Sequence, residues 1–344
     1  MSEPNVAARL HAPGDIRVAP EAVASPAPDD VLLRVAAVGL CGSDLHWFDE
    51  GGIGEAHVLR PAILGHEFSG VIVDGPRAGE RVVGDPLDAC ERCEWCLAGR
   101  ENLCHAARFA GFGETDGALR TLMPWPGRLL HRLPDAIEID EAALLEPLGV
   151  ALHALDLGDV PPGGEVGVYG CGPIGLMLVG LLRRSGASVV VATDRLAHRV
   201  AAARAMGATH AFIAPGRPAT PDVEADGDGR QRRVDVAFET GGDDALDDAI
   251  AAVRPGGRVV LVGIPDGDRT TFRAAGARRK ELSLQLCRRM LPGDLTRAIE
   301  LVASGGFDLS GLITHRVPIA EAADAFAIAS ARRGLKVIVR PSVA

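Results

Sequence analysis

The stretch that most constrains this chain is Val166–Gly175, which reads VGVYGCGPIG. Its first four residues predict a buried parallel strand, and the apolar run that continues to Leu182 predicts a helix. The glycines between them have the Gly-x-Gly-x-x-Gly spacing of a turn that binds the pyrophosphate of a dinucleotide at a helix N-terminus. The loop residues expected to contact such a cofactor are Gly170, Gly172, Pro173, Ile174 and Gly175.

The next predicted strand ends in an acidic residue at the required distance. Residues 188–193 are apolar and β-branched, and Asp194 follows them, about twenty residues past the glycines. A carboxylate there accepts hydrogen bonds from an adenosine ribose and favours NAD over NADP, although the adjacent Arg195 could accommodate a 2′-phosphate. The alternative interpretation is a turn without a ligand, with Asp194 as the N-cap of a helix that begins near Leu196.

The length and charge of the chain limit the other possibilities. A chain of 344 residues, 47% of them hydrophobic, predicts two globular domains. The net charge of −10 argues against nucleic acid or an anionic membrane as a partner. No apolar run reaches the roughly 18 residues of a transmembrane helix, and residues 1–20 do not form a signal peptide. We therefore expect a cytoplasmic location.

Four of the seven cysteines form one local cluster within residues 88–105. The ligand set that this spacing predicts is Cys90, Cys93, Cys96 and Cys104. Four thiolates make a closed tetrahedral zinc site without an open position, which is structural rather than catalytic. The alternatives are an iron–sulfur cluster, a redox pair or a nucleic-acid-binding zinc ribbon. Acidic residues flank the cluster, which disfavours the zinc ribbon.

The pattern of elements divides the chain. Residues 1–150 contain many short strands and predict a compact β-rich domain. Asp140–Leu157 has helical spacing, with Asp140 as a possible N-cap. From residue 166 onward, strands alternate with helices, as in a doubly wound parallel sheet, so residues 151–288 predict a Rossmann domain. We expect an irregular loop at 215–233 and two helices and a strand in 289–344.

A second metal site is suggested by scattered residues. Cys41, the pair His66 and Glu67, and Glu146 are residue types that could bind a catalytic zinc and leave room for substrate. Their spacing does not prove that they meet, because a lone histidine or cysteine is more often a core residue.

The order of these motifs resembles the zinc-dependent medium-chain dehydrogenase/reductase family. The resemblance covers almost the whole chain and is carried by Gly39–His46, Gly65–Gly70, the cysteine cluster, Glu146-Pro147-Leu148 and the Gly-rich loop. Within the family the chain looks most like the polyol dehydrogenases of the sorbitol (L-iditol) type. The resemblance implies a GroES-like β-rich catalytic domain, to which residues 289–344 return, and a Rossmann domain that binds NAD.

The resemblance also implies roles for single residues. Cys41 and His66 are expected to bind the catalytic zinc, and Glu67 and Glu146 to share the remaining position with water. Ser43 looks like the family's proton acceptor and His46 like the outer member of its relay. Two residues match substrate positions, and four match cofactor positions: Trp47 and Arg289 for the substrate, and Arg199, Val262, Gly263 and Ile264 for the cofactor. Trp47 could instead be a core residue, and Arg199 a solvated helix residue.

The implied reaction is hydride transfer from a secondary alcohol of a polyol to NAD, with two zinc ions per chain. Arg288 and Met290 replace the aromatic residues that usually flank the substrate arginine, so a cyclitol, an aminocyclitol or a simple secondary alcohol remains an alternative substrate. A non-enzymatic NAD-binding role would predict loss of some of the metal and proton-transfer residues, and all of them are present. Family likeness further implies a homo-oligomer, a dimer or a tetramer.

Overall fold

The computed structural model describes residues 5–214 and 233–342, which form two compact units. The first unit comprises residues 1–149 and 291–344, and the second comprises residues 150–290. The irregular loop expected at 215–233 lies almost wholly outside the described residues. Among the described residues, no helix combines the length and apolarity that a membrane span requires.

The first unit, which corresponds to the expected catalytic domain, is built mainly from short strands. A mixed sheet has the order β12-β8-β7-β3-β20-β19, and β11 also pairs with β3. A three-stranded sheet has the order β2-β1-β6, and two further strand pairs are β10-β9 and β4-β5. The strands are β1 Val6–Ala12, β2 Asp15–Pro20, β3 Asp30–Gly39, β4 Gly52–Ile53, β5 Ala56–His57, β6 Ala62–Ile63, β7 Glu67–Ile72, β8 Arg81–Gly84, β9 Leu87–Asp88, β10 Arg108–Phe109, β11 Leu122–Pro126, β12 Leu130–Arg132, β19 Ile313–Pro318 and β20 Lys336–Arg340.

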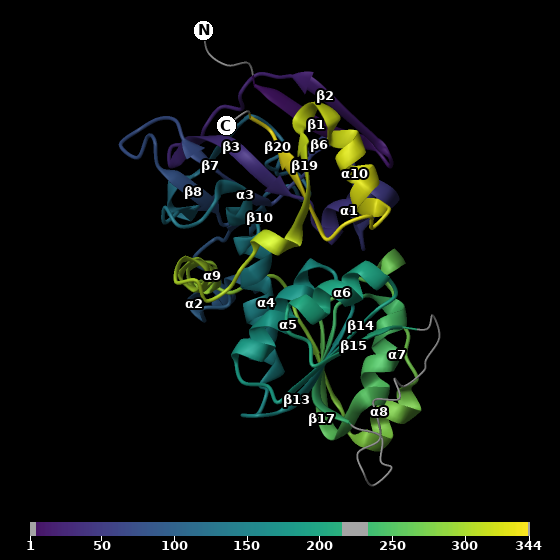
Figure 1. The fold of residues 1–344 in the computed structure, drawn as a ribbon. Helices are drawn as coiled ribbons and strands as arrows, with labels where there is room; N and C mark the ends of the chain where they lie inside the picture. Colours follow the sequence, from purple (N-terminus) through teal and green to yellow (C-terminus); the bar gives the residue numbers. More distant parts are fainter. Residues whose placement is uncertain (1–4, 215–232, 343–344) are drawn as a thin grey trace. The chain divides into compact units, whose positions relative to one another are not determined.

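The helices of this domain include α1, which the sequence analysis did not predict. The α-helices are α1 Gly42–Glu50, α2 Glu94–Leu97, α3 Ile139–Ala142, α4 Leu145–Gly158, which crosses the unit boundary, α9 Asp294–Ala303 and α10 Ala322–Ser330. The tail is integral to the domain, because β20 pairs with β3 and α10 packs against β20, and Figure 1 shows these yellow elements among the purple N-terminal strands.

One helix prediction was wrong in its details. The segment predicted as a single helix, 140–157, forms two helices, α3 and α4, and the N-cap of α3 is Glu138 rather than Asp140. Asp140 lies inside α3, and its carboxylate forms ion pairs with Arg316 and Arg340 instead of capping the helix. Its side chain is therefore used to hold the returning tail.

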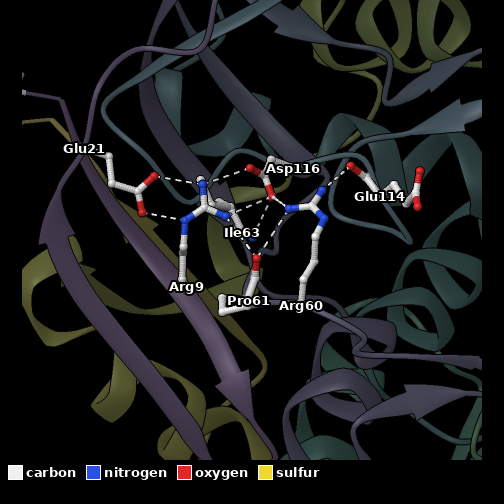
Figure 2. Close-up of polar contacts among 7 residues, drawn as sticks. All are labelled: Arg9, Glu21, Arg60, Pro61, Ile63, Glu114 and Asp116. Atoms are coloured by element: carbon white, nitrogen blue, oxygen red, sulfur yellow. Dashed lines mark hydrogen bonds and ion pairs between the residues drawn. The ribbon is translucent and has the colours of Figure 1, made fainter.

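A polar network secures the N-terminal hairpin beside the metal-site strands. Arg9 on β1 forms ion pairs with Glu21 at 2.5 Å and with Asp116 at 3.0 Å (Figure 2). Asp116 also accepts a 3.1 Å hydrogen bond from the backbone N–H of Ile63 on β6. Because β6 ends three residues before His66, the network fixes the chain that leads into the site.

The second unit, the Rossmann domain, contains a six-stranded parallel sheet in the order β15-β14-β13-β16-β17-β18. Helices cover both faces of the sheet and bury its apolar side chains. The helices α5 and α6 pack together, as do α7 and α8, and Figure 1 shows these two pairs on opposite faces. Each of the six strands overlaps one of the strands expected from the sequence at 166–170, 188–193, 211–214, 234–239, 258–263 and 282–286, although β17 begins five residues before the expected start. The elements are β13 Glu165–Tyr169, α5 Pro173–Arg184, β14 Val189–Asp194, α6 Ala197–Ala205, β15 His210–Ile213, β16 Val234–Glu239, α7 Asp243–Ala252, β17 Val253–Leu261, α8 Ala274–Lys280 and β18 Ser283–Leu286.

Candidate active site

Three of the predicted metal ligands converge in the catalytic domain. Cys41 is the N-cap of α1, just after β3, whereas His66 and Glu67 lie at the start of β7. The antiparallel pairing of β3 with β7 places Gly39 opposite Glu67, which brings the two chain segments together. One ligand atom from each of Cys41, His66 and Glu67 lies within 4.8 Å of the other two. A cysteine, a histidine and a carboxylate at this spacing fit a catalytic zinc.

Burial supports this fit. His66 is 6% exposed and Glu67 is fully buried. Within the described part of the chain, Oε1 of Glu67 has no hydrogen-bond partner. A buried carboxylate oxygen without a partner is costly, and a bound cation would satisfy it.

Asp44 orients the histidine, a role that the sequence analysis did not assign. Its Oδ1 lies 3.5 Å from Nδ1 of His66 and accepts a hydrogen bond from the Gly65 N–H, while its Oδ2 accepts one from the Cys41 N–H at 3.0 Å. Burial lowers the pKa of His66, but the charges of Asp44 and Cys41 outweigh it and raise that pKa well above its ordinary value. Burial raises the pKa of Asp44, and His66 more than reverses this. A carboxylate behind a metal-binding histidine fixes its ring orientation.

Glu146 lies near this cluster but outside it. It is buried in the first turn of α4. Burial and the charge of Glu67 raise its pKa to about 7, against the opposing effect of His66. The Glu146 carboxyl therefore interacts with the charges of His66 and Glu67. Its oxygens are not part of the group formed by Cys41, His66 and Glu67.

Lys336 is a second residue that the sequence analysis missed. Its Nζ forms an ion pair with Oε2 of Glu67 and donates a 2.9 Å hydrogen bond to the carbonyl of Leu40, and both charged side chains are at most 2% exposed. Burial lowers the pKa of Lys336, but Glu67 and Cys41 raise it above its ordinary value. A Cβ at Gly39 would lie 2.1 Å from Oε2 of Glu67, so only glycine leaves room for this pair. The signal in the sequence was that Lys336 is one of only two lysines and lies in an apolar strand.

The remaining predicted residues of the catalytic domain lie on α1. Ser43 is half-buried, and Nδ1 of His46 lies 2.6 Å from Oε1 of Glu50, one helical turn further on. Trp47 is 4% exposed and packs edge to face against Phe112 with ring centroids 5.3 Å apart. Trp47 is thus part of the hydrophobic core, as the alternative interpretation proposed.

The cysteine cluster forms as predicted from its spacing. The sulfur atoms of Cys93 and Cys96 are 3.4 Å apart, and those of Cys90 and Cys96 are 3.9 Å apart. The four sulfurs lie within 4.8 Å of one another, which suits a tetrahedral zinc ion. Backbone N–H groups of Arg92 and Cys93 lower the pKa of Cys90 to about 6, whereas desolvation raises that of Cys96 to about 12.

The Gly-rich loop lies at the carboxyl end of β13, in the centre of the parallel sheet. Gly170 has a φ of 106°, and a Cβ at Gly175 would lie 2.0 Å from the Gly170 carbonyl oxygen. Gly172 is the N-cap of α5, with Pro173 at the first helical position. The loop therefore has the close approach and the helix N-terminus that a pyrophosphate site needs.

Asp194 closes the neighbouring strand, β14. Its Oδ2 accepts a 2.8 Å hydrogen bond from the Cys171 N–H, and its Oδ1 accepts one from the Leu196 N–H. Leu196 is the N-cap of α6, so Asp194 supports the start of that helix without being its cap. Nη1 of Arg199 lies 3.9 Å from Asp194, and this arginine is only 15% exposed, which excludes the solvated interpretation.

The other cofactor and substrate positions follow later strands. Val262 and Gly263 come directly after β17 and donate their N–H groups to the carbonyl of Glu239, while Ile264 is 41% exposed. Arg289 also lies in the Rossmann domain and has a left-handed φ of 57°. Glu239, at the end of β16, is a third residue that the sequence analysis missed.

Comparisons with known proteins identify the class to which this fold and site belong. Residues 27–135 match the family model of the alcohol dehydrogenase GroES-like domain, and residues 173–304 match that of zinc-binding dehydrogenases. The chain therefore belongs to the zinc-dependent medium-chain alcohol dehydrogenase family, whose members use zinc and a nicotinamide cofactor.

Individual relatives cover nearly the whole chain. It is 35% identical to the sorbitol dehydrogenase of Bacillus subtilis over 345 residues, covering 98% of this chain and 97% of the relative. It is 36% identical to a probable D-xylulose reductase A of Aspergillus clavatus over 325 residues, covering 91% and 89% of the two chains. The crystal structure of a putative zinc-binding dehydrogenase from Sinorhizobium meliloti bound to NADP superimposes with a TM-score of 0.88 at 30% identity, covering 99% and 100% of the chains.

Proposed function

We propose that this enzyme oxidises a secondary alcohol of a polyol to a ketose with NAD as the hydride acceptor. The observation that carries the proposal is the cluster of Cys41, His66 and Glu67, in which the histidine and the carboxylate are buried. The same chain has a Gly-rich loop after β13, and Asp194 at the end of the neighbouring strand accepts a hydrogen bond from the Cys171 N–H of that loop. Two relatives named for acting on sorbitol and D-xylulose support a polyol substrate.

The catalytic domain would hold two zinc ions, one in each cluster. Cys41 and His66 would bind the catalytic ion, and Glu67 or Glu146 would complete its protein ligands. When bound, this zinc supplies Lewis acidity, which lowers the pKa of an alcohol toward neutrality. The four cysteines of the other cluster leave no open position, so the second ion would serve folding alone.

The chain's own residues would then position the groups and move the proton. Asp44 holds the His66 ring, and Lys336 balances the charge of Glu67. Ser43 accepts the proton of the substrate hydroxyl, and His46 passes it outward. The contact between Nδ1 of His46 and Oε1 of Glu50 fixes the orientation of that ring.

The Rossmann domain favours NAD through Asp194. Its carboxylate would accept hydrogen bonds from the adenosine ribose and repel a 2′-phosphate. Arg199 at 3.9 Å steadies this carboxylate. The cofactor-binding residues would be Gly170, Gly172, Pro173, Ile174, Gly175, Asp194, Arg199, Val262, Gly263 and Ile264.

Arg289 would contact the substrate, and the departures around it keep cyclitols, aminocyclitols and simple secondary alcohols as alternatives. We further propose a cytoplasmic location, and family likeness supports a homo-oligomer, a dimer or a tetramer.

The test is NAD reduction, followed at 340 nm, with a panel of polyols, cyclitols and simple alcohols, before and after treatment with a zinc chelator. We expect chelator-sensitive activity that is strongest with a polyol. Activity strongest with a cyclitol would select the alternative, and no activity with any alcohol would refute the proposal.

A further inference from the structure

A buried carboxylate of the Rossmann domain lies beside a loop that is proposed to bind the cofactor. Glu239 is the last residue of β16 and is 3% exposed. Its Oε1 accepts hydrogen bonds from the N–H groups of Gly241 at 2.7 Å and Gly242 at 2.6 Å. Its backbone carbonyl accepts bonds from Val262 at 2.8 Å and Gly263 at 3.1 Å. One residue thus joins the loop after β16 to the loop after β17.

The next residue extends the connection to the Gly-rich loop. Thr240 donates its hydroxyl to the Gly170 carbonyl at 2.6 Å and its N–H to the Tyr169 carbonyl at 2.8 Å. A Cβ at Gly263 would lie 3.0 Å from each oxygen of the Glu239 carboxylate. The carboxylate therefore lies directly against a backbone position that is expected to contact the cofactor.

The strand order indicates which half of the cofactor this carboxylate faces. Dinucleotides bind across the carboxyl ends of the strands where the strand order reverses, which in this sheet is between β13 and β16. Asp194, at the end of β14, lies on the adenosine side of that point. Glu239 is paired with Tyr169 in the β13–β16 register, on the opposite side, where the nicotinamide half would bind.

The contacts of Glu239 favour its charged form. Hydrogen bonds from two backbone N–H groups stabilise a carboxylate rather than a neutral acid. The positive N-terminal end of α7, which begins at Asp243, adds to this effect. Because the side chain is buried, solvent and salt screen its charge only weakly.

We propose that the Glu239 carboxylate strengthens the binding of the oxidised cofactor relative to the reduced one. The nicotinamide ring carries a positive charge in NAD⁺ and none in NADH, so a fixed negative charge beside it stabilises only the oxidised form. This inference rests on the proposed use of NAD, and it adds a determinant of cofactor redox preference to that function.

The experiment measures the dissociation constants of NADH and NAD⁺ for the zinc-loaded enzyme without alcohol, the first by nicotinamide fluorescence and the second by competition. Glu239→Gln removes the charge and keeps an oxygen that accepts both backbone bonds. We expect it to raise the ratio of the NAD⁺ constant to the NADH constant on the order of tenfold. Glu239→Asp, which keeps the charge, should keep the ratio near that of the wild type.

A control variant separates a local effect from a general change of charge. Asp235→Asn removes the same charge near the amino end of β16, where Asp235 pairs with Arg254. Its ratio should stay within about twofold of the wild type, because charge effects weaken with distance. An equal weakening of both cofactors in Glu239→Gln, or an unchanged ratio, would overturn the inference while leaving NAD binding intact. A wild-type enzyme that bound neither cofactor would overturn the proposed function as well.

Discussion

Replacing Lys336 with methionine removes one buried charge and little volume, so its effect can be estimated from the structure. The ammonium group pairs with Glu67 and bonds to the Leu40 carbonyl, and both charged side chains are at most 2% exposed. Removing one partner of a buried ion pair costs about 3–5 kcal/mol, because the other charge stays buried without a counter-ion. We therefore expect Lys336→Met to lower the free energy of unfolding by about 4 kcal/mol.

The assay is urea unfolding at pH 7, followed by circular dichroism, of protein stripped of zinc by a chelator, so that no metal ion replaces Lys336 as the cation beside Glu67. The double variant Lys336→Met/Glu67→Gln should recover most of the loss, because neither buried charge then remains. Lys280→Met is the matched control: among the described residues, Lys280 donates to the carbonyls of Ile250, Ala251 and Val253, and its loss should not be rescued by Glu67→Gln. A loss below about 1 kcal/mol in Lys336→Met, or no recovery in the double variant, would refute the reasoning.

Three further predictions follow from the catalytic domain. Gly39→Ala should reduce zinc content at the catalytic site, measured by elemental analysis, because its Cβ would lie 2.1 Å from Glu67 Oε2; a full zinc complement would contradict this. Asp140→Asn should lower stability by about 1 kcal/mol at pH 7 and by little near pH 3, as measured by urea unfolding. Burial raises the pKa of Asp140, but the hydrogen bonds and charges of Arg340 and Arg316 outweigh burial and lower it. The contribution of Asp140 to stability therefore exists above its unfolded pKa and disappears as the pH falls through its folded pKa. A pH-independent difference between Asp140→Asn and the wild type would refute this. Asp116→Asn, which breaks the ion pair in Figure 2, should cost about 1 kcal/mol in low salt and less in high salt, and equal losses would argue against an electrostatic role.

The sequence predicted the Rossmann sheet well because its strands are uninterrupted apolar runs between clear turns. It did not predict α1, since Gly42–Glu50 lacks a strong apolar period and becomes helical in contact with the rest of the domain. It also joined α3 and α4, because the break at residues 143–144 carries no glycine or proline to mark it.

The metal clusters differ in how far sequence could define them. The four residues of the cysteine cluster lie close in sequence, so their spacing alone predicted that they meet. Cys41 and His66 meet only through the pairing of β3 with β7, and Lys336 reaches Glu67 only because β20 pairs with β3. Register between distant strands cannot be derived from local patterns. The family resemblance was therefore needed to bring Cys41 and His66 together, and the pairing of Lys336 with Glu67 was missed.

The central claim is that Cys41 holds a zinc ion that serves alcohol oxidation. The most direct measurement is the zinc content per chain of the wild type and of Cys41→Ser, determined together with polyol-dependent NAD reduction. We expect two zinc ions in the wild type and one in the variant, which should keep its fold and lose its activity. A variant that retains the wild-type zinc content, or that still reduces NAD with a polyol, would contradict the account.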